Sequence, residues 1–195
     1  MKLCEGDVTL RDYVLSDVED EIKWLNEDTC WMEEDTPWLS YQPVDGNELR
    51  EAMTDMINNM PENAVRWRLE IEKAGKHIGF VSSYFLNKDF SPVDWEKVDE
   101  KKSIEENNLV RFLSIEICEE DYWGKGIGKV VLGLFMDYFR AIGENEFYIE
   151  TWSGNGKMIK CASKIGFEVV KRDKDAIDVY GVKYDNLIMK KSFLN

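Results

Sequence analysis

The sequence has few of the residues that metal sites and histidine-dependent catalysis require. It contains one histidine, His77, among 195 residues, which all but excludes a histidine relay or a multi-histidine metal site. Its four cysteines, at positions 4, 30, 118 and 161, lie far apart and form no CxxC pair. That spacing fits neither a small disulfide scaffold nor a zinc knuckle. We therefore expect reduced thiols, a cytoplasmic protein and no bound metal.

Long hydrophobic runs are also missing. Residues 130–135 form one of the longest, whereas a membrane span needs roughly 18 apolar residues. The first 15 residues include Glu5, Asp7, Arg11 and Asp12, which does not fit a basic-then-apolar signal peptide. Hydrophobic residues make up 44% of the chain and charged residues 33%, as in a folded globular protein. We expect one domain, residues 1–195, and no membrane partner.

Basic residues are scarce, because 25 Lys and Arg face 39 Asp and Glu, for a net charge of −14. Residues 1–60 hold 16 acids and 4 bases, so −12 of that charge lies in the first third. Nucleic acid is an improbable partner, since phosphate binding needs Lys/Arg clusters. Two interpretations of the acidic third stay open. It is a solvated surface, or it attracts a cationic partner.

Hydrophobic periodicity predicts a mixed α/β chain with one parallel crossover in residues 109–152. Residues 29–46 are expected to form a loop. Residues 87–108 are expected to form a polar surface insertion with at most a short helix. Alternation predicts strands at 8–14, 65–71, 77–86, 109–118, 146–152, 167–171 and 179–190, and helical spacing predicts helices at about 17–27, 47–60, 130–143 and 155–165.

A glycine-rich loop between a predicted strand and a predicted helix is the clearest chemical signal. Residues 124–129 read Gly-Lys-Gly-Ile-Gly-Lys, so backbone N–H groups, a helix N-terminus, Lys125 and Lys129 can converge on an anion. The spacing matches neither the mononucleotide P-loop nor the dinucleotide fingerprint. A nucleotide-dependent transferase is therefore disfavoured, and the loop predicts a pyrophosphate site of another kind.

Two segments together resemble the signatures of the GCN5-related N-acetyltransferase (GNAT) family. The first is Tyr-Trp-Gly-Lys-Gly-Ile-Gly at 122–128, which resembles that family's coenzyme A loop. The second is Glu-Thr-Trp-Ser-Gly-Asn at 150–155, followed by Ala-Ser-Lys-Ile-Gly-Phe at 162–167. The resemblance is closest to the ribosomal-protein N-terminal and small-amine branch. It implies a mostly antiparallel, splayed sheet flanked by helices, with an acetyl-CoA-binding core at 109–171 and acceptor-side helices at 1–60.

The resemblance also implies roles for particular residues. Pantetheine would pair with the backbone near Ile117 and Cys118, and Asn155 would face the thiol or the pantetheine. The pyrophosphate would lie on the loop formed by Gly124, Lys125, Gly126, Ile127, Gly128 and Lys129. Glu116 and Glu150 are the two candidates for the base that takes the proton of the amine. Ala162 stands where the family often has a tyrosine acid, so the general acid is left open.

The acceptor side would be walled by residues 30–38, which include Trp31, Glu33, Glu34 and Asp35. Carboxylates beside indole rings suit a cationic amine, although core tryptophans and solvated acids would give the same pattern. The expected function is transfer of the acetyl group of acetyl-CoA to a primary amine by direct attack in a ternary complex. The alternative is a non-catalytic acyl-CoA-binding module. The chain would act as a monomer or a homodimer.

Overall fold

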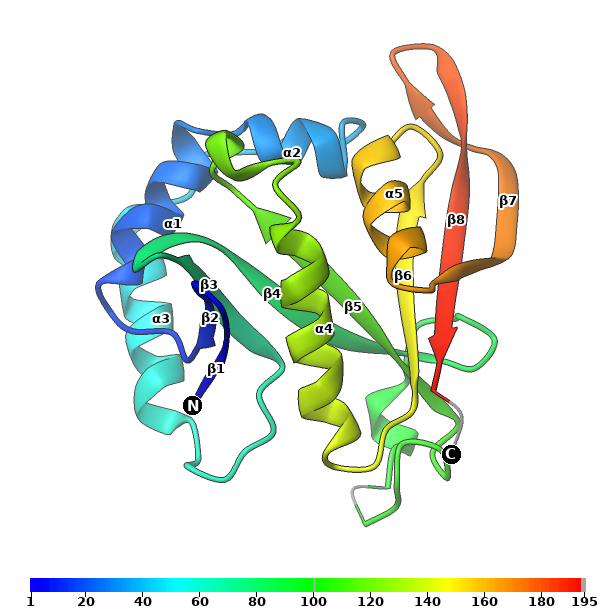
Figure 1. Ribbon diagram of the computed structural model, residues 1–195, viewed down its shortest axis with the longest axis horizontal. Coiled ribbons are helices and arrows are strands. Elements are labelled where there is room, and N and C mark those ends of the chain that lie inside the picture. Colours follow the sequence, from blue (N-terminus) through cyan, green and yellow to red (C-terminus); the bar gives the residue numbers. More distant parts are fainter. Residues whose placement is uncertain (100, 194–195) are drawn as a thin grey trace.

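The computed structural model describes residues 1–99 and 101–193 (Figure 1). These residues form one eight-stranded sheet in the order β1-β2-β3-β4-β5-β6-β8-β7. The strands are β1 (Lys2–Glu5), β2 (Val8–Arg11), β3 (Arg68–Lys73), β4 (Lys76–Asn87), β5 (Leu109–Ile117), β6 (Glu146–Trp152), β7 (Glu168–Val179) and β8 (Val182–Ser192). The helices are α1 (Asp17–Asn26), α2 (Cys30–Asp35), α3 (Gly46–Asn59), α4 (Ile127–Arg140) and α5 (Gly156–Lys164), with short 3-10 turns η1 (Trp95–Lys97) and η2 (Glu120–Tyr122).

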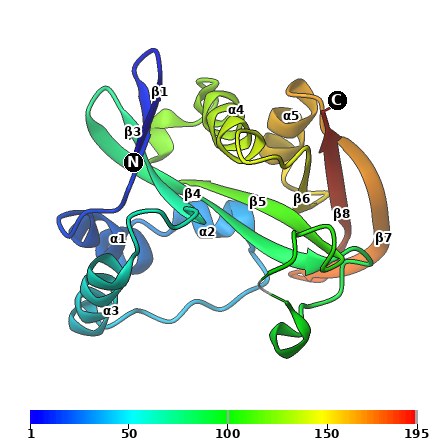
Figure 2. The same ribbon diagram turned by 90° about the horizontal axis from the view of Figure 1, so that it is seen from below.

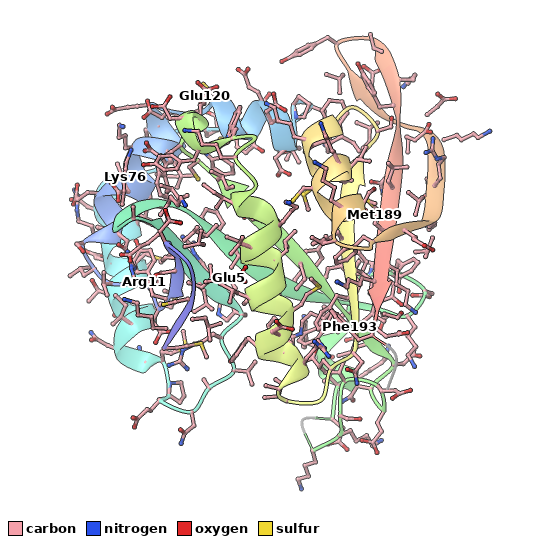
Figure 3. All side chains as sticks on the ribbon, viewed as in Figure 1. Glu5, Arg11, Lys76, Glu120, Met189 and Phe193 are labelled. Atoms are coloured by element: carbon pink, nitrogen blue, oxygen red, sulfur yellow. The ribbon has the colours of Figure 1, made fainter. Side chains whose placement is uncertain are left out.

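Helices cover both faces of the sheet. Helices α4 and α5 lie on one face, and α1, α2 and α3 lie on the other (Figure 2). The main core forms beneath α4, whose apolar side buries Val131, Phe135 and Phe139 against the sheet. The sheet extends to both sides of this helix, as the positions of Arg11 on β2 and Met189 on β8 show (Figure 3).

The sheet separates between its two parallel strands. All neighbouring strands are antiparallel except β5 and β6, which pair only at Arg111 with Phe147 and at Phe112 with Tyr148. Beyond these pairs the two ribbons diverge toward η2 (Figure 1). Residues 113–117 therefore keep β4 as a partner on one side and lack a strand partner on the other. This opening is the splay that the family resemblance implied.

Most predicted elements are present. The strand at 146–152 is confirmed at both ends, and the helices at 17–27 and 47–60 are confirmed to within one residue at each end. The turn at residues 73–76 joins β3 and β4, and the parallel crossover runs from β5 through α4 to β6. The insertion at 87–108 contains only the short turn η1. Among the described residues no group of His, Cys, Asp and Glu could hold a metal, and no described helix is long and apolar enough to cross a membrane.

Several predicted bounds were wrong, and one strand was missed. The strand predicted at 8–14 ends at Arg11, and the helix predicted at 130–143 spans Ile127–Arg140. Residues 29–46 are not all loop, because Cys30–Asp35 form α2, a helix of six residues that is too short to show periodicity. Strand β3 begins at Arg68 rather than at residue 65. The expected strand at 167–171 continues as β7 to Val179, because β8 pairs with it through two irregularities despite its polar sequence. Strand β1 was not predicted, since only Leu3 of its four residues is shielded from solvent.

His77 lies in a buried ionic network. Its Nδ1 lies 2.9 Å from Asp20 Oδ2 and its Nε2 lies 3.1 Å from Glu70 Oε2. Asp17 lies nearby, and the ring contacts the indole of Trp24. Burial alone would lower the pKa of His77, but the hydrogen bond and charge of Glu70, together with the two aspartates, raise it. The imidazolium thus joins α1 to the β3–β4 hairpin.

We expect His77→Gln to destabilise the protein in a pH-dependent way. The folded-state pKa of His77 is raised, so its charge stabilises the folded protein. This contribution to the free energy of unfolding is complete below the unfolded pKa of about 6.5 and is lost as the pH rises through the folded pKa. The free energy of unfolding should fall by about 1–3 kcal/mol at pH 6 and by less at pH 9. Urea unfolding at both pH values measures the difference, and an equal loss at the two pH values would contradict the charged network.

Candidate functional site

A cavity of about 510 Å³ occupies the opening between β5 and β6. It is lined from both faces of the sheet, by α2 on one side and by the glycine loop and α5 on the other. The residues that line it are Trp31, Glu34, Asp35, Leu113, Ser114, Ile115, Glu116, Ile117, Trp123, Gly124, Gly126, Gly128, Lys129, Glu150, Thr151, Asn155, Lys157, Met158, Lys160, Cys161 and Lys164.

The glycine loop presents the N-terminus of α4 to this cavity. Gly124 and Gly126 have φ of 72° and 82°, a left-handed conformation that glycine adopts without a steric cost. Gly126 is the N-cap of α4 and has no side chain that could bind the first N–H groups of the helix. These donors and the ammonium of Lys129 therefore remain available for an anion in the cavity.

Two residues of the predicted loop set do not line the cavity. Ile127 is buried in the main core, and the Lys125 ammonium lies 5.5 Å from the ring centre of Tyr122. Ile127 can still contribute its backbone N–H, because it is the first residue of α4. Of the predicted loop, the structure therefore brings Gly124, Gly126, Gly128 and Lys129 to the cavity, whereas the side chain of Lys125 lies outside its lining.

The end of β5 offers backbone groups to the opening. The Cys118 N–H donates to Ile78 O at 2.9 Å, on the β4 side of the strand. Because backbone groups alternate in an antiparallel ladder, the N–H and C=O groups of Ile115 and Ile117 point the other way, toward β6. The Ile117 carbonyl accepts a hydrogen bond from Trp123 Nε1 at 2.6 Å. Cys118 is not brought into the cavity, because its N–H is used within the sheet and its thiol is buried elsewhere. Burial also raises the pKa of that thiol, which makes it a poor nucleophile.

Glu116 directs a buried carboxyl into the cavity. Ile115 and Ile117 pack toward α4, so the alternation of the strand puts Glu116 on the opposite face. Its Oε1 accepts a hydrogen bond from Ser114 Oγ, and its buried Oε2 has no hydrogen-bond partner among the described residues. Burial raises the pKa of Glu116 to about 8, and the charge of Asp35 acts in the same direction while the Ser114 hydrogen bond opposes it.

Glu150 reaches the same cavity from β6 but lies in a different environment. It is exposed, and its Oε1 accepts a hydrogen bond from Asn186 Nδ2 at 2.7 Å. The Tyr84 phenol on β4 is a neighbour that sequence reasoning missed. Burial, followed by the nearby charges of Glu150 and Asp35, raises the pKa of Tyr84. The two glutamates thus differ in burial and hydration, and only Glu116 has an unpartnered buried oxygen.

Helix α2, which was expected to lie on the acceptor side, forms one wall of the cavity. Trp31, Glu34 and Asp35 line the cavity, whereas Glu33 is exposed outside it. Glu34 fixes the helix across the opening, because its carboxylate pairs with Lys157 Nζ at 2.8 Å and its carbonyl accepts a hydrogen bond from Trp152 Nε1. Loss of hydration raises the pKa of Asp35.

The charges that line the cavity separate by sign. The carboxylates come from α2, β5 and β6, and the lysines come from α4 and α5. Because α2 lies on the opposite face of the sheet from α4 and α5, an anionic ligand and a cationic one can approach the cavity from different faces (Figure 2). The carboxylates are Glu34, Asp35, Glu116 and Glu150, and the lysines are Lys129, Lys157, Lys160 and Lys164.

A family comparison assigns this architecture. Residues 7–168 match the acetyltransferase (GNAT) domain family. The chain belongs to the GNAT acetyltransferase family. This confirms the resemblance that the two sequence signatures indicated. A search of curated proteins gives no match.

Several GNAT acetyltransferases of known structure have the same fold. The ribosomal L7/L12 α-N-protein acetyltransferase RimL, in complex with coenzyme A, has a TM-score of 0.70 and 16% identity, and the alignment covers 99% of this chain and 98% of that one. The putative acetyltransferase yncA from Salmonella typhimurium, with acetyl-CoA, has a TM-score of 0.63 and 19% identity, and the alignment covers 96% of this chain and 94% of that one. The microcin C7 self-immunity acetyltransferase MccE, with acetyl-CoA and AMP, has a TM-score of 0.65 and 21% identity, and the alignment covers 97% of this chain and 94% of that one.

Three positions of the second GNAT signature have structural roles here. Asn155 lines the cavity and is the N-cap of α5, where its Oδ1 accepts a hydrogen bond from the Met158 N–H at 2.9 Å. Ala162 is fully buried in the main core and supplies no hydroxyl. Ser153 accepts a hydrogen bond from the Asp185 N–H and lies outside the cavity lining. None of these three side chains offers an obvious general acid.

Proposed function

We propose that this GNAT protein transfers the acetyl group of acetyl-CoA to a primary amine. The observation that carries the proposal is the cavity between β5 and β6, which joins a glycine loop and helix N-terminus on one side to the unpartnered Glu116 carboxyl on the other. The bound acetyl-CoA in yncA and MccE supports the same choice of cosubstrate.

Three parts of the cavity suit three parts of acetyl-CoA. The pyrophosphate would lie on the N–H groups at residues 124–129, next to Lys129. The pantetheine would lie along the unpaired edge of β5 and add to it as a strand does, using Ile115 and the Ile117 N–H. The Ile117 carbonyl is less available because Trp123 binds it. The thioester would then lie near Glu116.

The reaction would be direct attack of a neutral amine on the thioester carbonyl. The N–C bond forms as the amine attacks, and the C–S bond breaks as the coenzyme A thiolate leaves. Glu116, in its ionised form, would accept the proton that the amine gives up, directly or through a water molecule. A backbone N–H of β5 would stabilise the oxyanion. The thiolate would be protonated by solvent, since Ala162 offers no donor.

The acceptor would be a cationic amine, either a polyamine-like small molecule or a basic peptide N-terminus. Asp35 and Glu150 supply negative charge at the reacting end of the cavity, Glu116 adds to it once ionised, and Trp31 supplies an aromatic face. RimL acts on a ribosomal protein N-terminus, according to its name, which supports the peptide option.

Turnover of acetyl-CoA against a panel of amines tests the proposal. The panel would contain polyamines, aminoglycosides, basic peptides and neutral amines of similar size, with free thiol as the readout. We expect thiol release with cationic amines and at least about tenfold less with neutral ones. Equal rates with neutral amines would overturn the acidic acceptor wall. Tight binding of coenzyme A without turnover on any amine would instead favour a non-catalytic binding module.

A further inference from the structure

Three of the lysines that line the cavity have no acidic partner within the part of the chain that the structure describes. Lys157 pairs with Glu34, but Lys129, Lys160 and Lys164 form no ion pair with any described residue. This is notable in a chain with 39 acidic and 25 basic residues. Unpaired cations gathered at one cavity are the usual mark of an anionic ligand, because their mutual repulsion is relieved only when the ligand binds.

The geometry of α5 brings two of these lysines to one surface. Lys160 and Lys164 are four residues apart, so they lie one turn apart on the same side of the helix. Both lysines are exposed, and the adjacent Cys161 packs on the start of α4, where a Cβ added to Gly128 would lie 3.1 Å from its Sγ. Burial raises the pKa of the Cys161 thiol, and the charges of Lys129 and Lys164 oppose this rise, so both ammonium groups lie near the same thiol.

Coenzyme A carries more phosphate than the glycine loop accounts for. The pyrophosphate has its own donors in the N–H groups of residues 124–129 and in Lys129. The 3′-phosphate on the ribose is a separate dianion, and two ammonium groups one helical turn apart can bind it together. Lys160 and Lys164 are the unpaired cations left over for this group.

We propose that Lys160 and Lys164 bind the 3′-phosphate of coenzyme A and make the protein discriminate against 3′-dephospho-coenzyme A. This inference rests on the proposed use of acetyl-CoA but concerns a different part of the cosubstrate. It assigns to α5 a specificity role that neither the glycine loop nor the two glutamates require.

Calorimetric titration with coenzyme A and with 3′-dephospho-coenzyme A tests the assignment without knowledge of the acceptor. The wild type should bind coenzyme A about 10–100-fold more tightly than the dephospho form. The double variant Lys160→Met/Lys164→Met should bind both forms with the weaker affinity. Lys174→Met removes an unpaired, exposed lysine on β7 and should keep the wild-type ratio.

The outcomes of the titration separate a specific 3′-phosphate site from general attraction to anions and from failure of the acetyl-CoA proposal. Equal affinity of the wild type for both forms would overturn the 3′-phosphate site while leaving the acetyl-CoA proposal intact. An equal loss of affinity for both forms in the double variant would also overturn it, because general attraction to anions has that effect. Absence of binding of either form to the wild type would overturn both proposals.

Discussion

Glu116→Gln should lower kcat by about 10²–10³ with the best acceptor amine of the panel, because it removes the proposed base while keeping the size of the side chain. The pH profile gives the sharper test. Since burial raises the pKa of Glu116 to about 8, the carboxyl is protonated below that pH and cannot accept a proton. Wild-type kcat/KM should therefore rise with pH through about 8, and this step should be absent in the variant.

Glu150→Gln is the matched control, since it makes the same chemical change on the neighbouring strand. Glu150 is exposed and already accepts a hydrogen bond from Asn186, so its loss should cost less than Glu116→Gln and should preserve the step near pH 8. A larger loss in Glu150→Gln, with the step removed, would assign the base to Glu150 instead. The same amine must be used for both variants, because the acceptor has its own titration.

Gly79→Ala should have the largest effect on stability. Gly79 lies on β4 with φ of 150°, beside Ile78, which has no partner on β3 because the β3–β4 register shifts there. A Cβ at this position would lie 2.0 Å from the backbone oxygen of Glu116. No real Cβ makes so close a contact, so β4 and β5 must separate locally. We expect a loss of about 2–4 kcal/mol in the free energy of unfolding, and a loss of activity because Glu116 moves.

Gly133→Ala provides the control for this change. Gly133 lies within α4, and nothing lies within 4 Å of an added Cβ. Alanine should stabilise the helix there by about 0.5–1 kcal/mol. Urea unfolding and acetyl transfer, measured on both variants, distinguish the effect of the clash expected at Gly79 from that of a glycine-to-alanine change without a clash. If Gly79→Ala were as stable and as active as Gly133→Ala, the close approach of β4 to β5 would be refuted.

The parts of the site predicted from sequence are those set by local chemistry. The glycines at 124 and 126 were recognisable because a helix N-terminus that approaches a ligand needs a backbone without side chains, and both have positive φ. The strand at 146–152 was predicted at both ends because its aromatic and β-branched residues are followed by a glycine and the helix-capping Asn155. These signals depend on neighbours in the sequence, so they can be read without the fold.

The parts that were missed depend on contacts between distant segments. The burial of Glu116 comes from the way β5 and α2 meet, and no local pattern distinguishes it from Glu150. The hydrogen bond from Trp123 to the Ile117 carbonyl depends on the turn at η2, which brings the two residues together. The cavity lysines of α5 looked like ordinary surface residues, because only the absence of acidic partners across space sets Lys160 and Lys164 apart.

The central claim is that acetyl-CoA lies between β5 and β6 with its acyl group at Glu116. A crystal structure with coenzyme A linked covalently through its acyl group to a polyamine tests this most directly. The account predicts phosphates on residues 124–129, pantetheine along Ile115 and Ile117, and the linking nitrogen within hydrogen-bond distance of the Glu116 carboxyl. A pantetheine chain outside the opening, or a linking nitrogen remote from Glu116, would contradict it.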